Sequence, residues 1–253
     1  MSLTPAEQLL QELGVTEPDE IDLEAIAFHA GARVRYRPLD GCEARIIGRG
    51  NAAIITVNAK SPYRRRRFSI AHELGHWHHH RGQSLVCRVE EYRPHHALSS
   101  ERVADAYAAD LLMPNYLFRP FARQQAKLTF KAVGAIADTF STSHTATAIR
   151  LVESDQFPAL LVCHGMQGRK WFMRAPSVPD HWFPNQALDT ASSAIDVLFG
   201  GKPDDPMPRK IGAGAWFNYW EAPRYEIHEQ TMRTGDDEVL TLLLFGDSRM
   251  LQE

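Results

Sequence analysis

Two histidines four residues apart, with a glutamate directly after the first, are the residues of this chain best suited to do chemistry. His72, Glu73 and His76 lie in the run FSIAHELGHWHHH. Residues i and i+4 of a helix share one face, so both imidazoles can point at one metal ion. Glu73 is poorly placed as a third ligand but well placed to deprotonate a metal-activated water. The spacing therefore predicts a zinc site, although an isolated match of this kind also occurs by chance on surface helices.

A third ligand is predicted from the segment SSERVADAYAADLLMP, where Glu101 and Asp105 are also four residues apart. The segment between His76 and Glu101 is long enough for a turn and an antiparallel return helix. Two histidines and one glutamate leave the fourth position of zinc for water, as in catalytic sites. Asp105 can then accept the second ring N–H of a ligating histidine. Alternatively, Glu101 only stabilises the first turn of its helix, with Ser99 or Ser100 as the cap, and both roles are compatible.

Together, RRFSIAHELGH and ERVADAYAADLLMP resemble the signature pair of the ImmA/IrrE family of bacterial zinc metallopeptidases, over roughly residues 20–150. The resemblance implies a gluzincin-like site in which His72, His76 and Glu101 bind Zn²⁺ and Glu73 is catalytic. It also implies a substrate class, the helix-turn-helix (XRE-type) repressors that keep stress-response or mobile-element genes off. A metzincin site is excluded, because the positions that would need glycine and histidine hold His79 and Gly82.

The histidine run after His76 leaves one question open. His80 continues the series of His72 and His76 along nearly the same helix face. As a fourth protein ligand it would close the site, whereas hydrogen-bonded to a ligand it would support the site. We favour the supporting role, because the family often carries a histidine at this position.

Composition is typical of a globular enzyme: 253 residues, 44% hydrophobic and 23% charged, with a net charge of −3. The amino terminus has no apolar signal-like core and no stretch reaches the length of a membrane span, so we expect a cytoplasmic protein without membrane contact. Three widely spaced cysteines, Cys42, Cys87 and Cys163, suit a reducing compartment. The net charge does not favour nucleic acid as a partner, and the sequence does not indicate the oligomeric state.

Two features could bind other partners. The basic run Arg64 to Arg67 is interpreted as a solvated loop before the metal helix, tethered by Arg67, rather than as an anion site. The segment AVGAIADTFSTSHTATAIRLVE resembles a helix-turn-helix with Ser141 as a cap, which makes a DNA-binding regulator a rival function. Its second helix has no Arg or Lys before Arg150, a poor set for DNA. A second rival is a metal-binding sensor or interaction module that does not cleave its partner, although such a module has no need of Glu73.

The turn-forming residues and the hydrophobic periodicity of the sequence predict an α+β fold with three parts. These are a zincin-like metallopeptidase core with a small antiparallel or mixed sheet (1–120), a helical subdomain (121–155) and a smaller α+β domain (156–253) that is a candidate for sensing or substrate docking. In the core we expect helices at 4–13 and 23–31, then strands at 33–38, 42–47 and 52–58.

The strand 52–58 is the candidate edge to which an extended substrate would add, the alternative being an internal strand. Beyond residue 114 we expect helices at 116–124, 131–140 and 143–154. In the last domain we expect a helix at 188–199 and strands that include 159–165, 169–175, 211–220, 224–233 and 239–245.

Overall fold

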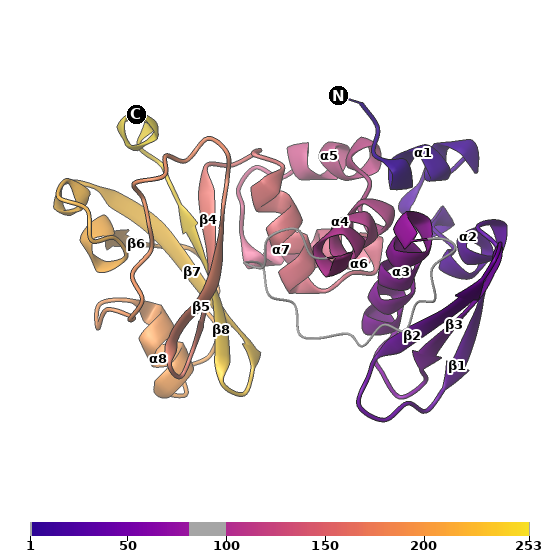
Figure 1. Ribbon diagram of the computed structural model, residues 1–253. Helices are drawn as coiled ribbons and strands as arrows, with labels where there is room; N and C mark the ends of the chain where they lie inside the picture. Colours follow the sequence, from indigo (N-terminus) through magenta and orange to yellow (C-terminus); the bar gives the residue numbers. More distant parts are fainter. Residues whose placement is uncertain (1, 81–99, 253) are drawn as a thin grey trace. The chain divides into compact units, whose positions relative to one another are not determined.

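The computed structural model describes residues 2–80 and 100–252, apart from the side chain of His80. The chain forms two compact units (Figure 1). The first comprises Met1–Phe121 with Ala137–Ser143, and the second comprises Ala122–Ile136 with His144–Glu253. Helices and sheets occur in both units, so the predicted α+β class is confirmed. The three-part division of the sequence stays a prediction.

The first unit begins with two short helices whose amino ends are capped by side chains. Helix α1 spans Pro5–Glu12 and starts with a capping box, in which Thr4 and Glu7 bond each other's backbone N–H. Helix α2 spans Leu23–His29 and is capped by Asp22. A 3-10 turn, Pro18–Glu20, lies between them. Both helices lie close to their predicted positions because cap residues mark their first turns.

A three-stranded sheet follows, with β1 at Ala32–Arg37, β2 at Ala44–Arg49 and β3 at Ala52–Asn58. The strand order is β1-β3-β2, with β1 parallel and β2 antiparallel to β3. The prediction that Ala52–Asn58 is a substrate edge is therefore wrong, because β3 is paired on both sides. Within residues 2–80 and 100–252, the edge strands of this sheet are β1 and β2.

Helix α3 spans Tyr63–His80 and packs against β2 and β3, while α2 packs against β1. Trp77 fixes α3 in place: its indole Nε1 donates to the Ala30 carbonyl at 2.8 Å. The ring also fills the space above Gly48, where a Cβ would lie 2.5 Å from Trp77 Cζ3. Arg64 to Arg67 fall inside the first turns of α3, so their predicted placement in a loop is wrong.

Two helices continue the first unit. Helix α4 spans Ser100–Leu112 and packs along α3 and α1, and α5 spans Asn115–Arg123. The backbone N–H of Asn115 at the start of α5 donates to the buried carboxylate of Glu7. This hydrogen bond links the first turn of α1 to the beginning of α5.

Helices α6, Phe130–Phe140, and α7, His144–Glu153, form the segment that resembles a helix-turn-helix. Ser141 has a φ of +53°. The backbone N–H of Ser141 donates to the Asp138 carbonyl and that of Thr142 donates to the Ala137 carbonyl. These two hydrogen bonds form a Schellman motif at the end of α6. Ser141 thus closes α6 instead of capping α7, contrary to the prediction.

The second unit is built on a five-stranded antiparallel sheet of order β5-β4-β8-β7-β6, with α7 against β4 and β5 and α8 against β7 and β8. The element bounds are β4 Ala159–Gly165, β5 Gly168–Arg174, α8 Ser193–Phe199, β6 Arg209–Gly212, β7 Glu226–Gly235 and β8 Glu238–Leu244. Three 3-10 turns occur at Ala213–Ala215, Ala222–Arg224 and Ser248–Leu251.

Two predictions for the second unit need correction. Helix α8 starts at Ser193, later than residue 188, because Ser192 caps it. The expected strand 211–220 is also wrong. It contains only the last two residues of β6, after which a 3-10 turn begins and places Trp216 in the core at 2% exposure. Within the described ranges, no helix is long and apolar enough to cross a membrane.

Candidate metal centre

Helix α3 presents His72 and His76 on one face. Their Nε2 atoms lie 3.0 Å apart, and the residues are 3% and 1% exposed. Two ring nitrogens this close, and almost sealed from solvent, cannot both carry a proton without repulsion. A cation between them removes that conflict, because each neutral imidazole offers it a lone pair.

Helix α4 brings Glu101 to the same point. Glu101 Oε2 lies 3.2 Å from His72 Nε2, and Glu101 Oε1 lies 3.4 Å from His76 Nε2. The three ligand atoms all lie within 4.8 Å of one another. Glu101 is half-buried in the first turn of α4, so the expected placement at the start of a helix also holds. The donor set of two imidazoles and one carboxylate fits a divalent metal ion.

Asp105, one turn further along α4, contacts the other ring nitrogen of His72. Its Oδ1 lies 2.8 Å from His72 Nδ1, so that nitrogen can donate its proton and leave the Nε2 lone pair toward Glu101 and His76. Burial by itself lowers the pKa of His72. The hydrogen bond and charge of Asp105, together with the charges of Glu73 and Glu101, outweigh burial and raise the pKa above its usual value.

Glu73 lies beside these residues and is 0% exposed. Among the described residues, neither of its carboxylate oxygens has a hydrogen-bond partner. Burial raises its pKa to about 7, with a further contribution from the charge of Glu101, although His72 acts in the opposite direction. A buried carboxylate without donors is expensive to keep ionised. A nearby cation or a water that donates to it would supply the missing interaction, and a pKa near neutrality suits a general base.

The remaining histidines of α3 have different surroundings. His78 stacks on Tyr107, with ring centroids 5.1 Å apart and an interplanar angle of 25°. His79 meets the same ring edge-on at 5.9 Å. The side chain of His80 lies outside the described residues, so its role beside the metal stays a prediction.

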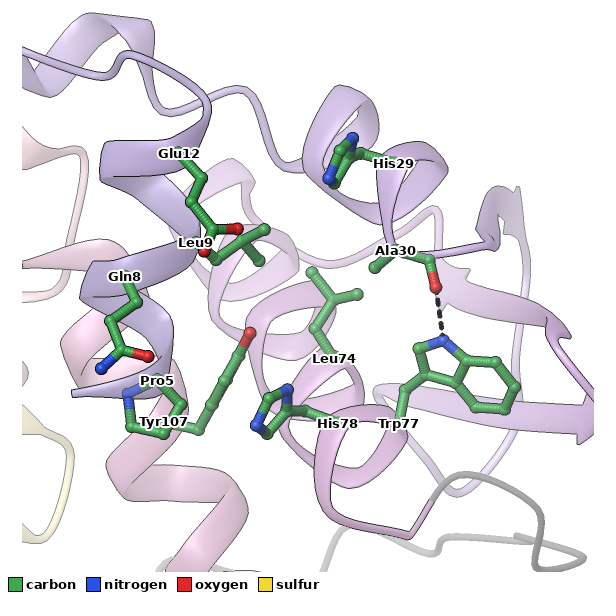
Figure 2. A pocket seen from close by; sticks show the side chains of 10 residues that line it. All are labelled: Pro5, Gln8, Leu9, Glu12, His29, Ala30, Leu74, Trp77, His78 and Tyr107. Atoms are coloured by element: carbon green, nitrogen blue, oxygen red, sulfur yellow. Dashed lines mark hydrogen bonds between the residues drawn. The ribbon is translucent and has the colours of Figure 1, made fainter.

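A pocket of about 320 Å³ lies on another side of α3 (Figure 2). Leu74, Trp77 and His78 of α3 contribute to it, with Tyr107 of α4 and residues of α1 and the end of α2. On a helix, Leu74 and His78 leave the axis about half a turn from His72 and His76. Because none of the three candidate ligands lines this pocket, we do not assign it to the metal centre.

The arginine run at the start of α3 is held by partners within the first unit. Arg64 pairs with Asp138 and donates to the Thr142 carbonyl at 2.9 Å. Arg67 donates to the Ile21 carbonyl at 3.1 Å, which is the predicted tether. These contacts of Arg64 and Arg67 hold the amino end of α3 in place. The two side chains are therefore not free to bind an anionic ligand.

One residue of the site could not be assigned from the motif alone. A Cβ at Gly75 would lie 2.8 Å from the Ala104 Cα, so only glycine permits the present approach of α3 to α4. That approach places Glu101 and Asp105, which flank Ala104 on the same helix, against the histidines. The small residue inside HELGH was the available signal, but its partner lies on a distant segment.

Comparison with known proteins adds two findings. The family model described as Peptidase M78, IrrE N-terminal-like domain, matches residues 24–152. No curated protein sequence matches the chain. A solved structure described as a Mycobacterium tuberculosis transcriptional regulator is similar with a TM-score of 0.62 and 13% identity, covering 94% of this chain and 74% of that chain. At this identity the likeness concerns the fold alone.

Proposed function

Because the chain belongs to the Peptidase M78 family of IrrE N-terminal-like domains, we propose that it is a zinc-dependent endopeptidase acting on a protein substrate. The observation that carries the proposal is the convergence of His72, His76 and Glu101 beside a buried Glu73 that has no hydrogen-bond partner among the described residues. Three protein ligands leave one coordination position free, which is the arrangement of catalytic zinc sites. A site with a purely structural role would not need the buried base.

In the proposed peptide hydrolysis, the metal ligands, Glu73 and Asp105 have different roles. A zinc ion held by the three ligands supplies Lewis acidity, which acidifies water and polarises a peptide carbonyl. Glu73 accepts a proton from the water that attacks the carbonyl carbon. It returns that proton to the leaving amine nitrogen as the C–N bond breaks. Asp105 keeps the proton of His72 on Nδ1, so that Nε2 remains a ligand throughout.

We place the substrate backbone along β2, which replaces the interior strand β3 as the candidate edge. Strand β2 is at one edge of the sheet and packs against α3, the helix that carries the metal ligands. The other edge strand, β1, packs against α2. An extended peptide can add to a free strand edge through main-chain hydrogen bonds. This arrangement would deliver a scissile bond to the neighbourhood of α3.

The substrate class that we propose is a helix-turn-helix repressor of the XRE type, whose cleavage would derepress stress-response or mobile-element genes. This part rests on the resemblance of the two motifs to the ImmA/IrrE family. We expect the protein to act in the cytoplasm, where such a repressor would be found.

The test is incubation of the zinc-loaded protein with the repressor encoded beside its gene, followed by mass spectrometry of the products. We expect a discrete pair of fragments with the wild type and none with Glu73→Gln, which should still bind zinc. Asp40→Asn, an exposed loop substitution, serves as the matched control and should cleave normally. Equal cleavage by Glu73→Gln would refute the assignment of the base. A stable uncut complex with the wild type would favour the non-cleaving interaction module.

A further inference from the structure

The sheet of the first unit has one face covered by helices and one face that carries arginines. In β2 and β3, buried residues alternate with more exposed ones, and in β1 Ala32 is buried, Val34 intermediate and Tyr36 exposed on the same face. This set of residues faces α2 and α3. We call the opposite surface the arginine face. It comprises Arg33, Arg35 and Arg37 of β1, Ile54 and Thr56 of β3, and Arg45, Ile47 and Arg49 of β2.

Strand pairing arranges these side chains in rows. Arg35, Thr56 and Arg45 lie directly opposite one another across the three strands. The neighbouring row is Arg33, Ile54 and Ile47. Adjacent strands are about 4.8 Å apart, so the arginines of β1 and β2 form two lines about 10 Å apart on either side of β3.

The charge of this face is not balanced within the described part of the chain. None of its five arginines forms an ion pair with another described residue. The three strands contain no Asp or Glu. The arginines at the start of α3 differ, since Arg64 has Asp138 and Arg65 has Glu43 within 4.0 Å. Because the whole chain carries a net charge of −3, the arginine face is a local concentration of positive charge.

Between the two lines of arginines the surface is apolar. Ile47 is 60% exposed and Ile54 is 37% exposed, and the two residues are paired across β2 and β3. Exposed isoleucines at the centre of a polar ring are typical of protein interfaces, which are also enriched in Arg and depleted in Lys. A nucleic-acid surface would be expected to offer aromatic side chains for stacking, and the outward positions of these strands hold none.

We propose that the arginine face binds an acidic segment of a partner protein, one whose carboxylates flank apolar side chains. The guanidinium group binds a carboxylate through two parallel hydrogen bonds, which a lysine cannot do. Apolar side chains of the segment would cover Ile47 and Ile54 while its carboxylates pair with the arginines on either side. The face is on the opposite side of the sheet from α3, so this binding does not depend on peptide hydrolysis at the metal centre.

The proposal is tested with a fluorescein-labelled peptide in which Glu and Leu alternate, and with the full-length protein in a chelator so that no hydrolysis occurs. Fluorescence anisotropy should show saturable binding that weakens with salt. The double variant Arg35→Glu/Arg45→Glu should bind about tenfold more weakly or worse, because like charges then oppose each other. Ile47→Ser should also weaken binding, as should a peptide with Gly in place of Leu.

Two controls separate this proposal from general electrostatics. Arg123→Glu/Lys127→Glu makes the same change in net charge at exposed positions outside the three strands and should leave the affinity unchanged. Arg35→Gln/Arg45→Gln removes the charges without reversal, in case the reversed variant folds poorly by circular dichroism. Peptide binding that survives both sheet variants would overturn the proposal. A duplex DNA that binds more tightly than the peptide, and is lost in the same variants, would overturn it in favour of a nucleic-acid surface.

Discussion

Gly75 of α3 and Ala104 of α4 meet so closely that a methyl group on Gly75 would lie 2.8 Å from the Ala104 Cα. Glu101 precedes Ala104 by almost one helical turn, and Asp105 follows it directly. Any separation of the two helices at this point moves both carboxylates away from His72. The distance between the helices is therefore part of the geometry of the candidate metal centre.

Gly75→Ala should reverse the usual effect of this substitution. Within a helix, Ala is more favourable than Gly by about 0.5–1 kcal/mol. Here overpacking against Ala104 should instead lower the free energy of unfolding by about 1–3 kcal/mol and weaken metal binding. Chemical denaturation and competition with a chelator measure the two effects. Gly134→Ala in α6 is the control, since its Cβ would meet only His144 Nε2 at 3.5 Å. The assignment fails if both substitutions stabilise the protein equally.

Asp105→Asn should weaken metal binding while leaving the fold intact. The carboxylate accepts the Nδ1 proton of His72, and an amide is a weaker acceptor that can also present its NH₂ group. Loss of such a partner typically weakens metal binding about 10–100-fold. Titration against a fluorescent zinc chelator gives the affinity. Asp40→Asn, in an exposed loop, should leave it unchanged, and unaltered binding in Asp105→Asn would contradict the orienting role.

The metal-free protein should lose stability between about pH 4.5 and pH 7, partly because of Glu73. Its pKa is raised from 4.5 to about 7, so the folded state holds a proton that the unfolded state releases in this window. The stabilising contribution is present below pH 4.5 and is lost as the pH rises, by up to about 3 kcal/mol. The raised pKa of His72 acts in the same direction.

Glu73→Gln isolates this contribution. In a chelator, thermal denaturation of the variant should show a smaller decline between pH 5 and pH 7.5 than the wild type, because the neutral amide does not titrate. The part of the decline that His72 owes to Asp105 and Glu101 should persist in both proteins, whereas the part due to the charge of Glu73 is lost in the variant. An identical decline in the two proteins would mean that Glu73 is not a buried, partnerless carboxylate.

Ser141→Gly should stabilise the protein. Ser141 has a φ of +53° at the end of α6, a conformation that costs a residue with a side chain about 1 kcal/mol relative to glycine. The free energy of unfolding, measured by urea denaturation, should rise by roughly 0.5–1 kcal/mol. Ser143→Gly, just before α7 and without a positive φ, should not stabilise. A destabilised Ser141→Gly variant would show that its hydroxyl matters more than its backbone conformation.

The parts that the sequence predicted correctly depend on local periodicity. His72 and His76 share a face because they are one helical turn apart, and the start of α2 follows from its Asp22 cap. The position of β3 between β1 and β2 could not be predicted. Strands pair through backbone hydrogen bonds, and the side chains of an interior strand can alternate in the same way as those of an edge strand. The partners of Arg64 likewise come from residues 138 and 142, which no local pattern connects to it.

The arginine face illustrates the same limit. The alternating arginines of ARVRYR and ARIIGR are visible in the sequence, but they lie on strands that do not pair with each other. Only the insertion of β3 between them places Arg35 and Arg45 in one row. The register of three strands therefore decides which charges share a surface.

Trp77 gives the metal motif a second constraint that concerns insertions and deletions. His76 and Trp77 are consecutive, and Trp77 is fixed by its bond to the Ala30 carbonyl and by its fit above Gly48. One residue inserted between His72 and Trp77 would turn the two by about 100° relative to each other. Either His72 or Trp77 would then be displaced from its present position. A change of length in this stretch would therefore displace a candidate ligand or Trp77 even if every residue type were kept.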